Sequence, residues 1–224
     1  MITLEFGALA PYAGVFARGL WLTVQLAVVA SVLGVAIGVL GALGRGSANP
    51  MARAIATSYV ELVRNTPFLV QLFFIFFGLP ALGVKLSAEV AAFLTLTLNL
   101  GAYATEIVRA GLESVSRGQR MAAASLGLTP GQTLVHVVLK PAFANIWPGL
   151  ASQLVLIMLG SAVVSQIAAE DISFAANFVQ SRNFRAFESY LAATFLYLGL
   201  AIAMRQVLLQ LGRRLFAWRH AGAR

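Results

Sequence analysis

The sequence predicts an all-α membrane protein whose helices cross a bilayer five times. Hydrophobic residues make up 59% of the 224 residues and charged residues only 11%, and the mean hydropathy is +0.83. Soluble domains carry about 25% charged residues and roughly 45–50% apolar ones. A soluble fold of this length could not bury so much apolar surface. The apolar residues also occur in runs that reach the length of about 20 residues needed to cross a bilayer.

The first three predicted spans follow directly from these runs. The first covers residues 20–43 and ends at the turn-forming sequence of residues 44–50. Its apolar run is too long for a signal peptide, and no basic segment precedes it. The second lies within residues 55–79 and contains Pro67, and the third covers residues 88–112.

The fourth apolar stretch, residues 133–169, is too long for one crossing at about 1.5 Å per residue. Pro141 and Pro148 fall inside it, and proline breaks or kinks a helix because it lacks an N–H donor and clashes with the preceding turn. We therefore expect a cytoplasmic or interfacial helix over residues 133–146 and a true span over residues 148–169.

The fifth predicted span covers residues 190–211, and the polar, Phe-rich connection at 170–189 is long enough to hold a short surface helix. Residues 113–141, between the third and fourth spans, are polar and basic with frequent Ala and Gly. No apolar run there could cross a bilayer, so this segment must lie in water or against another protein. We expect residues 1–224 to form a single transmembrane domain.

The distribution of lysine and arginine predicts the orientation, because cytoplasmic loops carry an excess of these residues. One side of the predicted topology holds eleven of the sixteen: Arg45, Arg53, Arg109, Arg117, Arg120, Lys140, Arg205, Arg213, Arg214, Arg219 and Arg224. The other side holds four: Arg18, Lys85, Arg182 and Arg185. The N-terminus is therefore expected outside, with residues 113–141 and the C-terminus in the cytoplasm. Since the basic residues flank apolar spans, a nucleic-acid partner is not expected.

Two similar turns place charges near the cytoplasmic ends of predicted spans. Glu61 precedes Arg64 by three residues, and Glu106 precedes Arg109 by three, so each pair shares a helix face and can form an ion pair. One interpretation is local pairing of interfacial side chains that reach toward water. The other is a charge network at the inner mouth that ties two helices to residues 113–141.

The sequence after Arg64 favours the network. Thr66 and Asn65 stand next to Pro67, where their side chains can satisfy backbone groups that a proline break leaves free within a span. We therefore assign an inner-mouth or gate role to one set of residues: Glu61, Arg64, Thr66, Pro67, Glu106 and Arg109.

Polar side chains also occur on the apolar spans, and five of them are candidates for a solute path: Gln71, Gln153, Ser161, Ser165 and Gln166. The alternative is that they join helices through interhelical hydrogen bonds. Ser161, Ser165 and Gln166 form the best cluster, because residues four and five apart fall on one side of an α-helix.

Sequence features of an enzyme are absent. The chain has no cysteine and only two histidines, His136 and His220, which lack metal-ligand spacing, so no metal site is expected. It has no glycine-rich phosphate-binding motif of the P-loop type, so ATP is not expected to bind here. No catalytic residues are proposed.

With these features in place, the chain resembles the membrane-spanning subunit of bacterial ABC importers, in particular the polar amino-acid permease group. Residues 118–127, GQRMAAASLG, followed by Leu139-Lys140-Pro141, are similar to the cytoplasmic "EAA" loop of that family. Residues 61–71, ELVRNTPFLVQ, match the group's Glu-x-x-Arg-Gly-Thr-Pro-x-x-x-Gln signature. Residues 102–111 and 183–188 match two further motifs, so the resemblance covers about three quarters of the chain.

The resemblance implies a function and a set of partners. The loop would form a coupling helix on a separate ATPase subunit, which would bind ATP, and no cofactor is expected in this chain. A second permease subunit, identical or homologous, and a periplasmic or lipid-anchored solute-binding protein are also implied, within the inner membrane and its lipid. The implied ATPase-interface residues are Gly118, Gln119, Arg120, Met121, Ala122, Ala123, Ser125, Leu126, Gly127, Leu128 and Pro141. Met121 departs from the motif, which has glutamate there.

Two other function classes remain as alternatives. A gradient-driven secondary transporter or channel would favour intramembrane carboxylates and inverted repeats, and neither is found in the sequence. A membrane scaffold without transport activity would use residues 113–141 only to bind a partner.

Overall fold

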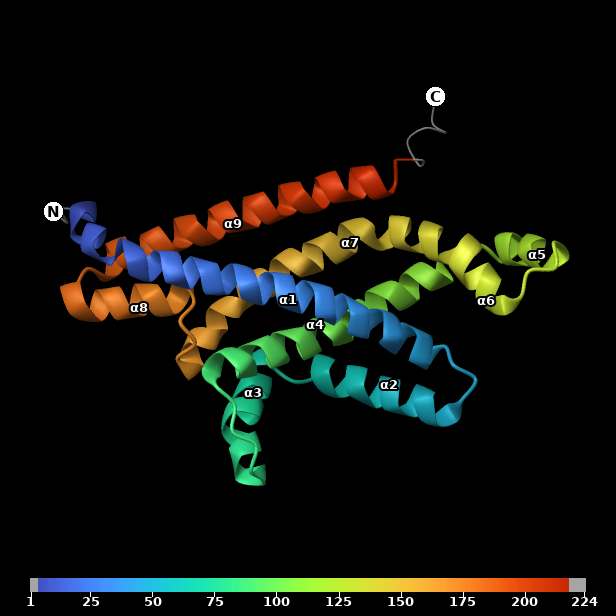
Figure 1. Cartoon of the computed structure of the whole chain (residues 1–224), viewed down its shortest axis with the longest axis horizontal. Coiled ribbons are helices and arrows are strands. Elements are labelled where there is room, and N and C mark those ends of the chain that lie inside the picture. The colour runs from blue at the N-terminus through green and yellow to red at the C-terminus, as the bar shows by residue number, and fades with distance from the viewer. Residues whose placement is uncertain (1–3, 218–224) are drawn as a thin grey trace.

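The computed structural model describes residues 4–217, and within this range all regular structure is helical. Four helical stretches in this range are long and apolar enough to cross a membrane, and a fifth crossing results if one bent pair of helices counts as a span. Figure 1 shows the long helices running along the longest axis of the molecule, with α5 and α6 at one end and α8 at the other. We name these ends the α5 end and the α8 end.

The helical segments follow in chain order as η1 (Phe6–Tyr12), α1 (Ala13–Arg45), α2 (Pro50–Arg64), α3 (Phe68–Phe73), η2 (Phe74–Gly78), η3 (Leu79–Leu82), α4 (Ala88–Glu113), α5 (Arg117–Ser125), α6 (Pro130–Gln132), η4 (Thr133–Val138), α7 (Leu139–Gly160), η5 (Ser161–Ile167), α8 (Ile172–Asn183) and α9 (Ala186–Leu215). The predicted first, third and fifth spans lie inside α1, α4 and α9. Arg219 and Arg224, which contributed to the predicted charge bias, lie outside the described residues.

Close packing of α1 against α4 forms the centre of the molecule. Glycines 34, 38 and 41 lie on one face of α1, at spacings of four and seven residues. A Cβ atom built on Gly38 would lie 2.4 Å from the Cβ of Ala104 on α4. Small residues at such a contact let two helix backbones approach closely, and this is the usual basis of helix association in membranes.

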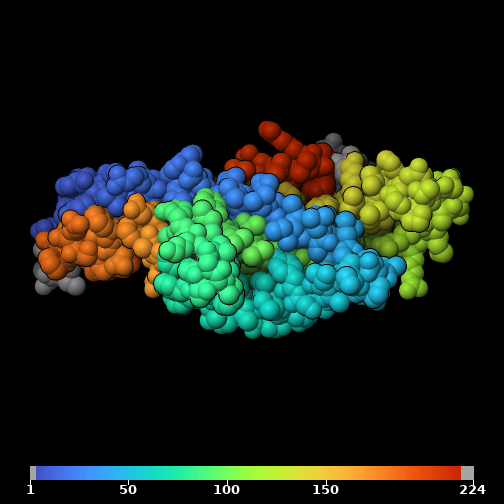
Figure 2. Space-filling view, turned by 60° about the horizontal axis from the view of Figure 1, so that its bottom comes forward, coloured from blue at the N-terminus to red at the C-terminus, as the bar shows by residue number. Residues whose placement is uncertain are grey.

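The predicted second span is not one continuous helix. α2 ends at Arg64, and the helical stretch that begins with α3 leaves it at an angle of 109°. Pro67 causes this break: it is extended, with φ −63° and ψ 140°, and its ring disfavours helical geometry at Thr66. The segment around α3 projects from the long helices in Figure 1 and lies at the front of the space-filling view (Figure 2).

The predicted interruption at Pro148 is wrong. α7 runs through Pro148, and the helical stretch from Pro130 to Ile167 is continuous over 38 residues. A proline inside a helix removes one hydrogen bond without necessarily ending the helix when neighbouring groups compensate. The helix type changes at two other places in this stretch: η4 is a π-helical turn and η5 is a 3-10 helix.

α9 packs on α7 through a small residue and an indole. A Cβ atom built on Gly212 would lie 2.1 Å from Nε1 of Trp147, so only glycine leaves room for the ring. The Trp147 Nε1 group donates a hydrogen bond of 3.0 Å to the carbonyl oxygen of Leu208, which satisfies the one polar atom of the ring.

At the α8 end, a buried carboxylate fixes the short helix that the sequence predicts within residues 170–189. Asp171 caps α8 by accepting a 2.8 Å hydrogen bond from the N–H of Phe174, and it accepts a 2.6 Å bond from the hydroxyl of Tyr197 on α9. Burial raises the pKa of the Asp171 carboxyl above its ordinary value, and these hydrogen bonds offset part of the rise. α8 is thereby tied to α9.

The substitution Gly38→Ala tests the contact between α1 and α4. The added methyl group overlaps Ala104, so we expect a loss of about 1–3 kcal/mol in stability, measured as a lower thermal unfolding midpoint in detergent. Gly199→Ala on α9 is the matched control, because a Cβ there meets nothing within 4 Å. Equal midpoints for the two variants would contradict the packing argument.

Candidate functional site

A single carboxylate at the α5 end of α4 faces three arginines from three helices. Glu106 contacts Arg45, the last residue of α1, through its Oε1 atom. Its Oε2 atom lies 3.1 Å from Nη2 of Arg109 and 3.8 Å from Nη1 of Arg64, the last residue of α2. We name these four residues the arginine cluster. It joins the ends of α1 and α2 to α4.

Partial burial makes this cluster more important than a surface ion pair. The side chains of Glu106 and Arg45 are each only 19% exposed, whereas Arg64 is 41% exposed. Removing one member of a shielded pair leaves an uncompensated charge, which costs more than the loss of a solvated contact. The Arg64 guanidinium also lies over the ring of Tyr103, 5.3 Å from its centroid, which is cation–π geometry.

One of the two predicted ion pairs forms in the structure. Glu106 and Arg109 pair as the spacing predicts, but within the described residues Glu61 and Arg64 form no ion pair. The exposed Glu61 accepts a 3.0 Å hydrogen bond from the side chain of Asn65, and Arg64 turns toward Glu106 instead. Sequence reasoning missed Arg45, whose only signal was its position at the end of an apolar run.

Gln71, predicted on a solute path, braces the break between α2 and α3. Its Nε2 group donates to the carbonyl oxygen of Val63 at 2.7 Å and to the carbonyl oxygen and hydroxyl of Thr66 at 3.0 and 2.9 Å. Its Oε1 atom accepts a 3.0 Å bond from Asn99 on α4. The Thr66 hydroxyl also donates to the carbonyl oxygen of Leu62 at 2.8 Å. These bonds satisfy backbone groups that the proline break leaves free.

The remaining predicted path residues do not share one face. Ser161 is fully buried and donates to the carbonyl oxygen of Met158 at 2.6 Å, Ser165 is half-buried, and Gln166 is exposed. The same-side interpretation assumed α-helical geometry. Since η5 is a 3-10 helix with 3.0 residues per turn, residues four and five apart point to different sides. Gln153 lies on α7 and is half-buried.

α5 is a short helix with defined caps at both ends. Ser116 caps its start by accepting a 3.3 Å hydrogen bond from the N–H of Gln119. At its end, the N–H of Gly127 bonds to the carbonyl oxygen of Ala124 at 2.9 Å, and that of Leu128 to Ala123 at 3.1 Å. This is a Schellman motif, and it requires the left-handed φ of +77° that Gly127 adopts.

α5 exposes almost its whole surface. Ala123 is its one buried residue, while Met121 is 65% exposed and Leu126, which follows the helix, is 81% exposed. All but one of the predicted ATPase-interface residues lie on α5 or on the turn after it. The exception is Pro141, which lies in the first turn of α7.

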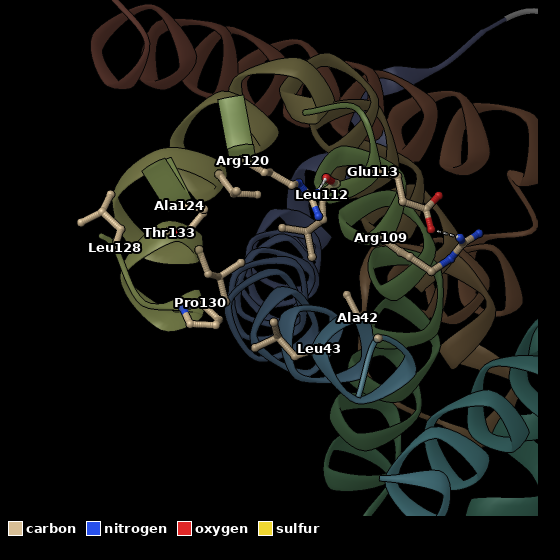
Figure 3. Close-up of a pocket in the computed structure, with 13 residues that line it drawn as sticks. Ala42, Leu43, Arg109, Leu112, Glu113, Arg120, Ala124, Leu128, Pro130 and Thr133 are labelled. Atoms are coloured by element: carbon tan, nitrogen blue, oxygen red, sulfur yellow. Dashed lines mark hydrogen bonds and ion pairs between the residues drawn. The ribbon is translucent and has the colours of Figure 1, made fainter. Parts of the chain in front are cut away.

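Between α5 and the rest of the molecule lies a cavity of about 640 Å³ (Figure 3). Its walls are the end of α1 with Ala42, the last turn of α4 with Leu112, and the segment from α5 to η4. Arg120 reaches back from α5 and donates a hydrogen bond to the carbonyl oxygen of Leu112. This bond links α5 directly to the helix that carries Glu106.

A second cavity of about 510 Å³ lies at the break between α2 and α3, lined by side chains that include Tyr59, Thr66, Gln71 and Phe74. The hydroxyl of Tyr59 donates to the carbonyl oxygen of Leu98 at 2.5 Å, so this cavity is also tied to α4. Within residues 4–217 no group of three or more His, Asp or Glu side chains could hold a metal ion.

Comparisons with known proteins were made on the sequence and on the fold. Residues 21–217 match the family described as binding-protein-dependent transport system inner membrane component. The chain is 34% identical to a probable amino-acid ABC transporter permease protein of Sinorhizobium fredii, over 86% of this chain and 84% of that protein. It is 31% identical to an arginine transport system permease protein of Bacillus subtilis, over 91% and 93% of the two chains.

Solved structures are similar over nearly the whole chain. A chain from a crystal structure of an amino acid ABC transporter with histidines superposes with a TM-score of 0.87 at 34% identity, covering 95% of this chain and 100% of that chain. A chain of an inward-facing methionine ABC transporter shares the fold, with a TM-score of 0.76 at 20% identity over 92% and 98% of the two chains.

The substitution Gln71→Met tests the brace at the helix break. It removes the bonds to Val63 and Thr66 and leaves the buried Asn99 amide without its acceptor, so we expect a loss of about 1–3 kcal/mol in stability. Gln166→Met, at an exposed position, is the matched control for thermal unfolding in detergent. An unchanged midpoint for Gln71→Met would show that the brace does not stabilise the fold.

Proposed function

The chain belongs to the family of binding-protein-dependent transport system inner membrane components, and from this premise we propose that it imports polar amino acids or close analogues as the permease subunit of an ATP-driven transporter. It is a multi-pass protein of the inner membrane. The observation that carries the proposal is α5, a capped and almost fully exposed helix between α4 and α7. A gradient-driven transporter would have no need of such a helix for an ATPase partner.

The proposed topology has five spans in one transmembrane domain, residues 1–224, with the bent pair of α2 and α3 counted as the second. The N-terminus lies outside and the C-terminus lies in the cytoplasm. The lysine and arginine bias supports this orientation. It places the α5 end in the cytoplasm and the α8 end outside.

In this arrangement α5 is the coupling helix between the third and fourth spans. It would dock on the ATPase subunit that binds ATP, while this chain has no catalytic role. The exposure of Met121 and Leu126 supports docking, because large apolar side chains at a cytoplasmic surface are favoured in contact with a partner. Met121 gives this contact an apolar side chain where the family motif has a carboxylate.

The other proposed partners follow from the shape of the chain. A second permease subunit is proposed because five spans are too few to enclose a transport pathway alone, and long apolar faces on α1 and α9, including Trp21, Leu40 and Phe195, are exposed and could pack against it. Lipid would cover the part of these faces that the second subunit does not. A solute-binding protein would dock at the α8 end. The amino-acid class rests on the relatives, whose names include arginine, glutamine and cystine.

Reconstitution tests the function as a whole. We expect proteoliposomes that hold the permease with its ATPase to accumulate radiolabelled amino acid only when both ATP and the binding protein are present. The control is the same preparation with a proton or sodium gradient and no ATP. Uptake driven by that gradient alone would contradict the proposed function.

Gly127 offers a sharper test of the coupling helix. Asn and Asp have nearly the same size and both tolerate the left-handed conformation that this position requires, so the pair separates charge from backbone strain. We expect Gly127→Asp to lower ATP-driven uptake at least about tenfold, since about 1.4 kcal/mol corresponds to that factor, and a carboxylate buried at the ATPase contact costs at least that much.

Gly127→Asn is the control and should retain most of the uptake, with both variants inserted in the membrane to the same extent. ATP hydrolysis is measured in parallel, because uncoupling leaves hydrolysis while uptake falls. Normal uptake by Gly127→Asp would remove the assignment of α5 as the coupling helix.

A further inference from the structure

The arginine cluster gathers the last turns of α1 and α2 onto one carboxylate of α4. We propose that Glu106 and Arg45 act as a latch of the transport cycle, whose contact holds the end of α1 closed against α4 and opens when α5 moves. This inference rests on the proposed transport function. It concerns two positioning residues, of which Arg45 is outside the motifs that the sequence indicated.

The first argument is that two of the three arginines of the cluster have second carboxylate partners within reach. Arg109 already contacts Glu113 at 2.6 Å as well as Glu106 at 3.1 Å. Arg64 makes the longest contact with Glu106, at 3.8 Å, and Glu61 lies on the same face one turn earlier. Arg109 and Arg64 can therefore exchange one carboxylate for another when Glu106 parts from Arg45.

The second argument is the excess of positive charge. Three guanidinium groups surround the single carboxylate of Glu106, so its negative charge screens their mutual repulsion. If Glu106 moves away, like charges on the ends of α1, α2 and α4 face one another at short range. The cluster therefore favours a closed arrangement with Glu106 in place and an open arrangement without it.

The third argument is the connection to α5. Glu106 and Glu113 lie seven residues apart, two turns along the same helix, and Glu113 ends α4. Arg120 on α5 binds the carbonyl oxygen of Leu112 in that last turn. A displacement of α5 therefore pulls on the turn where Glu113 competes with Glu106 for Arg109. Movement of α5 can thus be transmitted to Arg109, which has two alternative carboxylate partners.

The brace at Gln71 behaves differently from the latch. Both the nitrogen and the oxygen of its amide are bonded, to Val63, Thr66 and Asn99. The break between α2 and α3 therefore stays attached to α4 while the latch exchanges partners. Movement is therefore confined to the end of α1 that carries Arg45.

A reversible crosslink tests whether the latch must open. The chain has no cysteine, so Arg45→Cys with Glu106→Cys introduces the only two thiols. The full transporter with this pair is reconstituted, treated with a short, reducible bifunctional thiol reagent, and assayed for ATP-driven uptake before treatment, after treatment and after reduction. The single-cysteine chains, treated in the same way, are the controls.

We expect uptake by the crosslinked pair to stop and to return after reduction, while the same treatment leaves the uptake of each single-cysteine chain at its own untreated level. If the crosslinked pair transports as well as the untreated pair, the contact is static and the latch is wrong. If the wild-type chain shows no uptake that depends on ATP and the binding protein, the proposed function itself fails. The two failures are thus distinguished in one experiment.

Charge neutralisation provides a second readout that does not depend on crosslinking. Loss of about 1 kcal/mol from the closed state corresponds to about a fivefold shift in its equilibrium. We therefore expect Glu106→Gln to raise ATP hydrolysis in the absence of the binding protein about fivefold, and Arg45→Gln to act in the same direction. In the double variant the two effects should not add, because both substitutions break one contact.

The matched control is Arg53→Gln, an exposed arginine on the same helix as Arg64 but outside the cluster. It should leave basal hydrolysis unchanged. Additive effects in the double variant, or the same increase in Arg53→Gln, would overturn the latch.

Discussion

Polar groups in an apolar surrounding must find partners within the protein, and this constraint shapes most of the distinctive features of the chain. The proline break at Pro67 frees backbone carbonyl groups, and the side chains of Thr66 and Gln71 bind them. The carboxylate of Glu106 has arginines on both oxygens, and that of Asp171 is held by Tyr197. Gln71 lies beyond the break from the carbonyl group it binds, and Arg45 and Tyr197 come from different helices than the carboxylates they contact. Satisfying these groups therefore also joins the helices.

Apolar packing supplies the second organising principle, and it has a different geometry. The contact of α1 with α4 depends on glycines that let the backbones approach, and the contact of α9 with α7 depends on Gly212 beneath Trp147. Between lipid-facing helices, apolar side chains alone provide little driving force, because lipid tails are equally apolar. Close approach increases van der Waals contact between the helices. The hydrogen bonds and ion pairs between them then fix their relative orientation. The α5 end combines both principles, since α1 and α4 pack there and also share the arginine cluster.

Most of the helices could be predicted from the sequence, because long apolar runs in a bilayer have few other structures available. The sequence indicated Pro67 as a break and the flanking Thr66 as its compensation, although not the 109° bend. The predicted interruption of the helix at Pro148 was wrong. Proline lowers the stability of a helix, but the helix can continue through it where packing holds the surrounding turns. Glu61 and Arg64 have the spacing of an ion pair on one helix. That spacing cannot show that Arg64 faces Glu106 of another helix instead. The prediction that Ser165 and Gln166 share one helix side with Ser161 was wrong because it assumed α-helical geometry, whereas this segment is a 3-10 helix.

The caps of α5 have a consequence for how fast a partner can engage it. A nine-residue helix is too short to be stable alone in water, yet Ser116 and the turn at Gly127 close both of its ends. A partner therefore meets a formed helix and does not wait for a disordered segment to fold during association. Such a surface can be engaged and released in every turnover without paying the ordering entropy again. The chain thus presents its partner with a rigid, preformed helix, where a flexible segment would have to fold on binding.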